Sequence, residues 1–301
     1  MIKNFIKITL RNILRHKGYS FINITGLAVG MACCLLITLW VLDELSYDRF
    51  HENAPHLYRV EENQHYSGRL FHVNVTPYPI APVMVEEFPE IRDAARYVWA
   101  GGCLFKYGEK SFFENAVRAV DPSFLNMFTY PLIKGNKGSA LQSPDSIIIS
   151  QDIAVKYFGT EEPLGKIINI DNKYDFKVTG VLKNVPHNSH LQFQVLIPYE
   201  FIRKAGRTGD QWDSNSIRTF VQLQKGTTME QVNGKILDYI RTRVPESKTD
   251  LVLMPMVDIH LHQWFGYIKT MGAVQYVYIF SFIAPFKYKY KHTFKGMSSL
   301  I

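Results

Sequence analysis

The chain of 301 residues is 47% hydrophobic, 20% charged and 14% aromatic, which is enough apolar side chain for a folded core and excludes a disordered or fibrous protein. The net charge of +7 lies at the two ends, because residues 1–42 hold five basic residues and residues 274–301 hold four, with no acid in either range. Residues 43–273 carry 25 basic and 27 acidic residues, so the middle of the chain has no basic surplus for binding a nucleic acid.

Residues 1–20 alternate apolar and basic side chains. The apolar positions recur at intervals of three or four, as on one face of an α-helix, and they are Ile2, Phe5, Ile6, Leu10, Ile13 and Leu14. The basic residues are Lys3, Lys7, Arg11, Arg15 and Lys17. This pattern predicts an amphipathic helix in the cytoplasmic membrane interface, with the basic side chains among anionic headgroups. The alternative is a charged flank that only fixes the topology of the next segment.

Residues 21–42 contain no charge. A helix of this length is about 33 Å long, enough to cross a hydrocarbon core of about 30 Å, so we predict a transmembrane helix. A cleavable signal peptide would have a shorter apolar core and small residues at its end, whereas this run ends in Leu39-Trp40-Val41-Leu42. Basic residues precede the helix and Asp43, Glu44 and Asp48 follow it, which predicts a cytoplasmic N-terminus and an outer domain beyond the helix.

The predicted transmembrane helix carries small side chains along one narrow face. Gly26 and Gly30 form a GxxxG pair, and Cys34 lies one turn further on. Small residues let another helix approach closely, so we predict a helix-packing face for a partner helix that need not belong to a second copy of this chain. The alternative is the ordinary abundance of glycine in membrane helices. Of the other cysteines, Cys33 is in the same helix and Cys103 is alone in the outer domain, which excludes an internal disulfide there.

Residues 43–273 alternate between strand and helix patterns separated by turn residues. Strands are predicted at Leu57–Glu62, Leu70–Thr76, Phe112–Val120, Ser146–Ser150, Lys166–Ile170, Tyr174–Leu182, Gln192–Ile197, Ile217–Leu223 and Leu251–Met256. Helices are predicted at Ile80–Phe88, Pro122–Met127, Asp152–Phe158 and Thr228–Arg243. Thr227 or Thr228 is the expected cap of the last helix, with Glu230 in its first turn. The predicted fold class is α+β.

A series of short motifs runs through this domain. It begins with Tyr47-Asp48-Arg49-Phe50-His51 and Leu57-Tyr58-Arg59-Val60. It continues through Asp121-Pro122-Ser123-Phe124, Ile147-Ile148-Ile149-Ser150, Lys156-Tyr157-Phe158-Gly159, Pro163-Leu164-Gly165-Lys166, Val178-Thr179-Gly180-Val181-Leu182, Asn188-Ser189-His190 and Asp258-Ile259-His260-Leu261. In order and spacing this series resembles MacB/FtsX-like ABC transporter permeases. The resemblance implies a periplasmic core domain between the first and second membrane helices, with Asp258–Leu261 in the exit strand.

The same motifs have a local structural interpretation. Asp121 is expected to cap a short helix, with Pro122 at its first position, where a missing N–H costs nothing. Glycines are expected at element ends, where a positive φ or a close approach is needed. They are Gly135, Gly159, Gly165 and Gly180.

No motif for catalysis or nucleotide binding is found. The stretch Gly159–Lys166 is nearest to a phosphate-binding loop, but it has five residues between its glycines instead of four, and Ile167 replaces the hydroxyl residue. Ser189 lies beside His187 and His190, yet neither a nucleophile elbow nor a triad order is present. We therefore expect no catalytic residue, no cofactor and no enzymatic activity in this polypeptide.

Histidine pairs at short spacing raise the alternative of a metal site. His187 with His190, and His260 with His262, could each place two imidazoles together. Zinc sites usually have three or four protein ligands, and no third ligand is identifiable. His260 and His262 are expected on one face of a strand, solvated or at an interface, and no metal site is predicted.

Residues 274–286 begin like a second membrane helix, but Pro285 interrupts the run and residues 287–301 form a basic tail. Thirteen residues make about 20 Å of helix, short of the hydrocarbon core, so a partial second transmembrane helix is expected. Permeases of this type would continue with further spans and a loop that contacts the ATPase. We therefore expect a truncated or frame-shifted permease unable to support ATP-driven work by itself, with a genuine short form as the alternative.

The resemblance implies a permease subunit of an inner-membrane ABC transporter. A separate cytoplasmic ATPase would move the membrane helices, and the periplasmic domain would expel or release a substrate or activate a partner, which requires two linked states. The implied partners are that ATPase, the lipid bilayer, a second permease copy and a periplasmic substrate or protein. The alternatives are a single-pass anchored binding module and a signalling ectodomain, the latter disfavoured because no kinase or cyclase segment follows.

Overall fold

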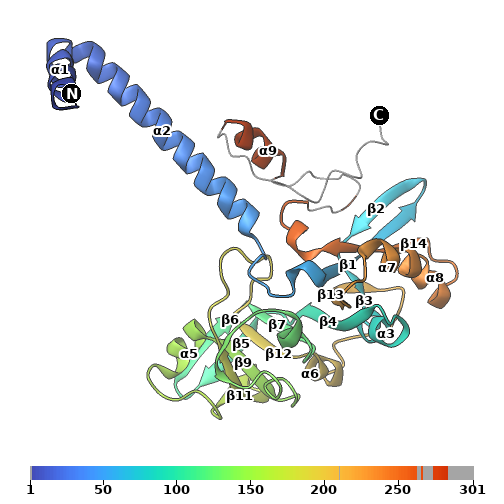
Figure 1. Cartoon of the computed structure of the whole chain (residues 1–301). Coiled ribbons are helices and arrows are strands. Elements are labelled where there is room, and N and C mark those ends of the chain that lie inside the picture. The colour runs from blue at the N-terminus through green and yellow to red at the C-terminus, as the bar shows by residue number, and fades with distance from the viewer. Residues whose placement is uncertain (1, 210, 263–265, 267–273, 284–301) are drawn as a thin grey trace. The chain divides into compact units, whose positions relative to one another are not determined.

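The computed structural model describes residues 2–209, 211–262, 266 and 274–283, and the chain divides into two compact units (Figure 1). The helical unit comprises residues 1–45 and 273–301, and the core unit comprises residues 46–272. All strands of the described residues belong to the core unit.

The helical unit contains α1 (Ile2–Arg15), most of α2 (Lys17–Ser46) and α9 (Val274–Ile283). The predicted amphipathic periodicity is realised in α1, and α2 extends beyond the predicted span at both ends. Its 30 residues make about 45 Å of helix, and it is the one helix among the described residues that is long and apolar enough to cross a membrane. The apolar side chains of α2 are mostly exposed, so its length is not explained by packing into a protein core.

The core unit is built on a mixed sheet of fourteen strands in its described part. Eleven of them follow the order β14-β1-β13-β4-β7-β12-β9-β11-β10-β5-β6, while β2 pairs with β1, β3 with β13 and β8 with β11. The strands are β1 (Leu57–Tyr66), β2 (Arg69–Val73), β3 (Thr76–Pro77), β4 (Ile91–Trp99), β5 (Cys103–Tyr107), β6 (Lys110–Glu114), β7 (Val117–Val120), β8 (Leu132–Gly135), β9 (Ser146–Ser150), β10 (Ile167–Ile170), β11 (Tyr174–Leu182), β12 (Val195–Pro198), β13 (Asn215–Leu223) and β14 (Thr249–Pro255). Most pairs are antiparallel, and β12/β7 and β11/β9 are parallel.

Short helices cover the sheet and complete the core. They are α3 (Ile80–Glu87), α4 (Phe124–Met127), α5 (Gln151–Phe158), α6 (Tyr199–Lys204), α7 (Met229–Ile236) and α8 (Tyr239–Arg243), with 3₁₀ turns η1 (Ala54–His56) and η2 (Met256–Asp258). Helices α3, α7 and α8 pack on β1, β13 and β14 around Val60, Ile80 and Ile236. A second cluster gathers aromatic rings around α4, including Phe124 and Tyr130, whose pairs each add about 0.5–1.5 kcal/mol beyond area burial. The α+β class expected from the sequence is therefore confirmed.

Three strands and one helix were not expected from the sequence. They are β4, β5, β8 and α6. Strand β4 lacks the alternation of apolar and polar residues that predicts a strand, because Arg92, Asp93 and Arg96 interrupt its apolar residues. Arg96 is accommodated there because both its backbone N–H and its guanidinium donate to Asp121, at 2.6–2.8 Å.

The predicted strand Phe112–Val120 is wrong, because the chain makes two strands there. β6 pairs with β5, whereas β7 pairs with β4 and β12. Between them, the carbonyl of Ala116 accepts from the N–H groups of Gln194 and Val195. The two strands thus take different partners, and the short break lets the chain change position in the sheet.

The predicted single helix Thr228–Arg243 is also two helices. Thr228 caps α7 as expected, and its side chain and that of Gln231 form a reciprocal capping box. The helix ends because the carbonyl of Leu237 accepts from the N–H of Leu251 on β14, at 3.0 Å, and so leaves the helical hydrogen-bond series. Strand pairing therefore overrides the apolar periodicity.

The expected exit strand at Asp258–Leu261 is wrong as well. Met256–Asp258 forms η2, and the N–H of His262 donates to the carbonyl of Asp258 in the turn that follows. The expected cap at Asp121 is likewise wrong, because its carboxylate is bound by Arg96 and the side chain of Ser123 donates to the carbonyl of Ala94 instead.

Three of the four glycines lie at or next to element ends as expected, whereas the expectation is wrong for Gly180, which lies inside β11. Gly135, Gly159 and Gly165 have φ values of +92°, +63° and +80°. At Gly135 a Cβ would also lie 2.4 Å from the carbonyl oxygen of Thr179. Gly180 needs no positive φ, but a Cβ there would come within 3.3 Å of Leu132, so its role is the close pairing of β8 with β11.

Candidate functional site

Two segments of the core unit adjoin the helical unit in sequence. The N-terminal connector, residues 46–51, begins at the last residue of α2, and the C-terminal connector comprises residues 256–262 and 266. Asp48 sits at the turn of the first connector with φ of +58°, and the N–H of Arg49 donates to the carbonyl of Ser46. A positive φ is tolerated by aspartate more readily than by most residues, which suits this sharp change of direction.

The carboxylate of Asp48 is completely buried and bound by one residue. The backbone N–H of His190 donates to Oδ1 at 3.0 Å, and His190 Nδ1 lies 2.7 Å from Oδ2. Burial lowers the pKa of His190 although Asp48 opposes that shift, so the ring is a neutral imidazole that donates Nδ1–H to the carboxylate. Asp48 is therefore held by two directional hydrogen bonds, which fix the connector in one conformation.

Asn188 holds the same connector from the other side of the turn. Its Nδ2 donates to Ser46 Oγ at 2.9 Å and its carbonyl accepts from the N–H of Asp48 at 2.9 Å. In the sequence, the motifs at residues 47–51 and 188–190 are separate members of one series, but the structure joins Asp48 to His190 across 142 positions. The sequence contains both motifs and no signal of their contact.

His51 ends the N-terminal connector inside an aromatic pocket. Its Nδ1 accepts from the N–H of Thr129 at 3.0 Å, and its ring packs edge-on against Phe128 and Tyr130. Burial lowers the pKa of His51 to about 4, so this imidazole is neutral at ordinary pH. Tyr130 in turn contacts Ser189 Oγ at 3.0 Å, which links the pocket to the loop that carries His190.

The two connectors contact each other within the core unit. The ring of Tyr47 stacks on His260 with parallel planes and 3.4 Å between centroids. Arg49 lies close enough to Asp258 to oppose the rise in its pKa that burial causes. The C-terminal connector is also tied to β2, because Gly266 and His72 exchange two backbone hydrogen bonds of 2.7 and 3.0 Å.

A buried polar network lies along one face of β1. Arg59 donates to Glu61 Oε1 through Nε at 2.7 Å, and His72 Nε2 lies 2.7 Å from Glu61 Oε2. The other ring nitrogen of His72 lies 2.7 Å from Asn63 Oδ1. Arg59, Glu61 and His72 are each at most 3% exposed, so the guanidinium of Arg59 and the carboxylate of Glu61 compensate each other's charge inside the protein. In the sequence, Arg59 stood out only as part of the motif at residues 57–60, and Glu61 and His72 carried no signal.

The residues expected in the membrane are placed on helices of the helical unit. Gly26, Gly30 and Cys34 share one face of α2 and line a shallow groove together with Leu27, Met31 and Leu35. A Cβ at Gly26 or Gly30 would meet nothing within 4 Å. The basic residues are exposed, and they are Lys3, Lys7, Arg11 and Arg15 on α1 with Lys17 at the start of α2. Helix packing and headgroup binding remain predictions.

The histidine pairs considered for a metal take other roles. His190 binds Asp48 and His260 stacks on Tyr47. Across residues 2–209, 211–262, 266 and 274–283, no group of three or more His, Cys, Asp or Glu side chains is placed to hold a metal. Ser189 contacts Tyr130 and Leu191, so its hydroxyl is a structural partner.

An apolar helix long enough to cross a membrane is followed in the chain by an α+β core domain. The chain belongs to the MacB-like periplasmic core domain family, whose sequence profile matches residues 20–239. The match spans most of α2, the connector after it and the core strands through β13. The resemblance drawn from the motif series is thus confirmed.

Solved structures share this fold at low sequence identity. A domain described as part of a permease from Porphyromonas gingivalis is 23% identical with a TM-score of 0.59, over 68% of this chain and 92% of that one. The periplasmic region of MacB from Actinobacillus actinomycetemcomitans is 16% identical with a TM-score of 0.51, over 68% and 91%. The extracellular domain of the noncanonic ABC-type transporter YknZ from Gram-positive bacteria is 13% identical with a TM-score of 0.50, over 66% and 99%. No curated protein is similar enough in sequence to count as a match.

Proposed function

We propose that this chain is a permease subunit that couples ATP hydrolysis by a separate cytoplasmic ATPase to the export or release of a periplasmic substrate. The observation that carries the proposal is the unbroken passage of α2 into a connector whose turn is fixed by buried hydrogen bonds from His190 and Asn188. The family match, which includes α2, supports the same role. The ATPase, the bilayer, a second permease copy and a periplasmic substrate are the proposed partners.

Mechanical coupling requires a rigid path from helix to domain. A displacement of α2 along its axis acts on Ser46 and Asp48, which are bonded to the loop at 188–190, and that loop leads to β12. The Tyr47/His260 stack gives the two connectors a shared contact that a change in their separation would break. Coupling of this kind needs two states with different connector contacts, and it needs no catalytic residue.

The proposed topology follows from the charge of the helical unit. Residues 1–20 would lie in the cytoplasmic interface, residues 21–42 would span the inner membrane and residues 43–273 would be periplasmic, with a partial second span at 274–286. A reporter fused at residue 1 should then be cytoplasmic and one inserted near Gly206 periplasmic. Labelling of both from the same side would refute the topology.

Co-purification followed by hydrogen exchange tests the coupling. The full chain would be isolated from native membranes, and we expect an ABC ATPase to accompany it. With ATP and vanadate, amide exchange at residues 46–51 and 256–262 should change, while the exposed turn at 225–227 serves as an unchanged control. Absence of an ATPase, or unchanged exchange at both connectors in its presence, would contradict the proposal.

A second candidate is a single-pass anchored binding module without transport activity. It is favoured by a polar cleft beside β1 that contains the buried carboxyl of Glu62. In that case only periplasmic partners would accompany the purified chain. The same purification therefore separates the two candidates.

A further inference from the structure

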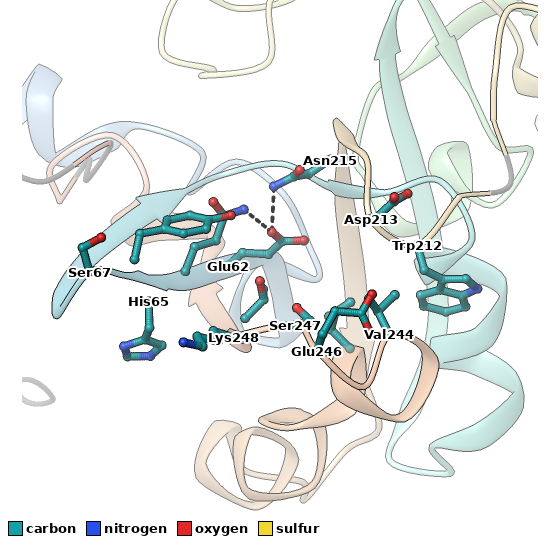
Figure 2. A pocket seen from close by; sticks show the side chains of 14 residues that line it. Glu62, His65, Ser67, Trp212, Asp213, Asn215, Val244, Glu246, Ser247 and Lys248 are labelled. Carbon is teal, nitrogen blue, oxygen red and sulfur yellow. Dashed lines mark hydrogen bonds between the residues drawn. The ribbon is translucent and has the colours of Figure 1, made fainter.

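A cleft of about 430 Å³ opens beside β1, at the start of β13 and the loop between α8 and β14 (Figure 2). Its volume lies within the range of small-molecule sites. Both polar and apolar side chains line it, including Glu62, Trp212, Asn215, Ile240, Val244 and Glu246. The cleft lies apart from the connectors, and nothing in the proposed coupling uses it.

Glu62 is the most unusual group in this cleft. Its side chain belongs to a residue only 2% exposed, and Gln64 Nε2 and Asn215 Nδ2 both donate to Oε2 at 2.8 Å (Figure 2). Oε1 receives no hydrogen bond from the described residues, and in Figure 2 the Glu62 oxygen without dashed lines points away from Asn215. The carboxyl therefore has one satisfied oxygen and one that faces the cleft.

No cation of the described chain is paired with Glu62. Burial raises its pKa to about 7, and the two amide hydrogen bonds oppose that rise only in part. Two basic side chains line the cleft. His65 pairs with Asp250 at 2.9 Å, and Lys248 is exposed to solvent. A buried carboxyl without a counter-charge gains most from a ligand that brings one.

The rest of the lining favours the same kind of ligand. Asp213 and Glu246 place two further acids at the cleft, so its charge attracts cations. Trp212, Ile240 and Val244 supply apolar surface beside the carboxyl. A charged head with an aliphatic stem matches this combination better than a bare metal ion, which would need several oxygen ligands converging on one point.

We propose that this cleft binds an organic cation, an ammonium or guanidinium group on an aliphatic stem, whose N–H groups donate to Glu62 Oε1. The stem packs against Trp212, Ile240 and Val244. Two sources carry this chemistry, a free amine and the basic side chain of a peptide. The site is independent of the coupling proposal and would remain if no ATPase partner were found.

Calorimetric titration of the full chain in detergent at pH 8 tests this inference. The probes are agmatine, cadaverine and Nα-acetyl-lysine N-methylamide, with Nα-acetyl-norleucine N-methylamide as the uncharged control. At least one cationic probe should bind at least tenfold more tightly than the control. Preference for agmatine or cadaverine identifies a free amine, and preference for the lysine derivative identifies a peptide side chain. Equal binding of charged and uncharged probes, or no binding of any cation, overturns the proposal.

Variants locate the site. Glu62→Gln keeps the shape and removes the charge, so we expect at least a tenfold loss of cation affinity, whereas Glu109→Gln, an exposed acid in the turn between β5 and β6 that does not line the cleft, should leave it unchanged. Ser247→Phe leaves Glu62 in place and fills the cleft, and it should also abolish binding. Unchanged affinity in either Glu62→Gln or Ser247→Phe overturns the assignment.

Proton release gives a second readout that a purely structural carboxyl would not produce. A bound cation favours the ionised form of Glu62, so binding at pH 6 should release a proton, while binding at pH 9 should release none. Titrations in two buffers of different ionisation enthalpy measure this number. The release should be absent in Glu62→Gln, and equal release in wild type and variant would contradict the proposal.

Discussion

The two faces of β1 hold neighbouring carboxyl groups in opposite circumstances. Successive residues of a strand point to opposite sides, so Glu61 and Glu62 enter different layers of the core unit. Glu61 is bonded to Arg59 and His72, whereas Glu62 is bonded among the described residues only to the amides of Gln64 and Asn215. Both residues are at most 2% exposed. In the part of the chain that the structure describes, one buried carboxyl is thus paired with a cation and the other is not.

Glu61 therefore contributes to the structure as one half of a buried ion pair, whereas Glu62 is free of a cation among the described residues and can bind one from a ligand. A buried charge that is fully paired contributes to a unique conformation, and removing one partner leaves the other uncompensated. A buried carboxyl bonded only by neutral groups keeps its proton to higher pH and can respond to a ligand. Neighbouring positions with the same residue type should therefore respond differently to the same substitution.

The largest expected effect is at Glu61. Glu61→Gln leaves the guanidinium of Arg59 buried without a counter-charge, so we expect a loss of about 3–5 kcal/mol in the free energy of unfolding. Urea unfolding of the full chain in detergent, followed by tryptophan fluorescence, measures it. The double variant Arg59→Met, Glu61→Leu removes both charges and should lose less. A loss below about 1 kcal/mol in Glu61→Gln would show that the network is not a closed unit.

The same substitution at Glu62 should have the opposite sign at high pH. The native pKa of about 7 exceeds the ordinary value of 4.5, so the native state keeps a proton that the unfolded chain has lost, and stability falls as pH rises through this window. Glu62→Gln has no such penalty. We expect it to be more stable than wild type by up to about 3 kcal/mol at pH 8 and equally stable near pH 4. Destabilisation at pH 8 would contradict the account.

His51 affects the pH dependence of stability in the opposite direction to Glu62, over an overlapping pH range. Its native pKa of about 4 lies below the ordinary 6.5, so the unfolded state binds the proton first and stability is lost as pH falls below 6.5. This loss should reach about 2 kcal/mol at pH 4.5. It opposes the Glu62 contribution in wild type, so the Glu62→Gln background should reveal it. His51→Asn in that background should flatten the profile, and an unchanged slope would exclude His51 as the cause.

The smallest expected effect concerns one amide partner. Asn215→Ala removes a hydrogen bond to Glu62 Oε2, so the pKa of Glu62 should rise further and stability at pH 8 should fall by about 1 kcal/mol. The pH dependence of unfolding measures both changes. Gln64→Ala removes the other amide and serves as the matched variant. If either variant lowers the pKa of Glu62, these amides do not stabilise the ionised carboxylate.

The fold class and family were predictable from the sequence, but the ion networks were not. Alternating apolar residues located strands such as β1, β11 and β13, and the ordered motifs indicated the family. The predicted strand at Leu57–Glu62 also placed Glu61 and Glu62 on opposite faces. The same alternation places Arg59 on the face of Glu61, but nothing in the sequence indicated that His72 would join them, because that depends on the tertiary placement of β2.

Contacts between segments that are distant in the sequence could not be predicted from it either. The pairing of Asp48 with His190 joins two loops that share no periodicity, and loop geometry rather than side-chain pattern brings them together. The end of α7 has a similar cause, because Leu237 bonds to β14 instead of the next helical turn. Which partner each group bonds to depends on competition between hydrogen-bond partners that are distant in the sequence, and a single sequence does not show which of them come close.

The register of β1 with β14 determines how this domain bears load. Tyr58 is opposite Pro255, so the antiparallel pair has its two connectors at the same end. A pull that separates the connectors would therefore break the hydrogen bonds between β1 and β14 one after another from the connector end, and not all of them at once. The Tyr47/His260 stack lies ahead of the first of these hydrogen bonds. The hydrogen bonds that hold Ser46 and Asp48 to residues 188–190 lie there too, so the same pull would act on the stacked rings and on that loop before the strand pair opens.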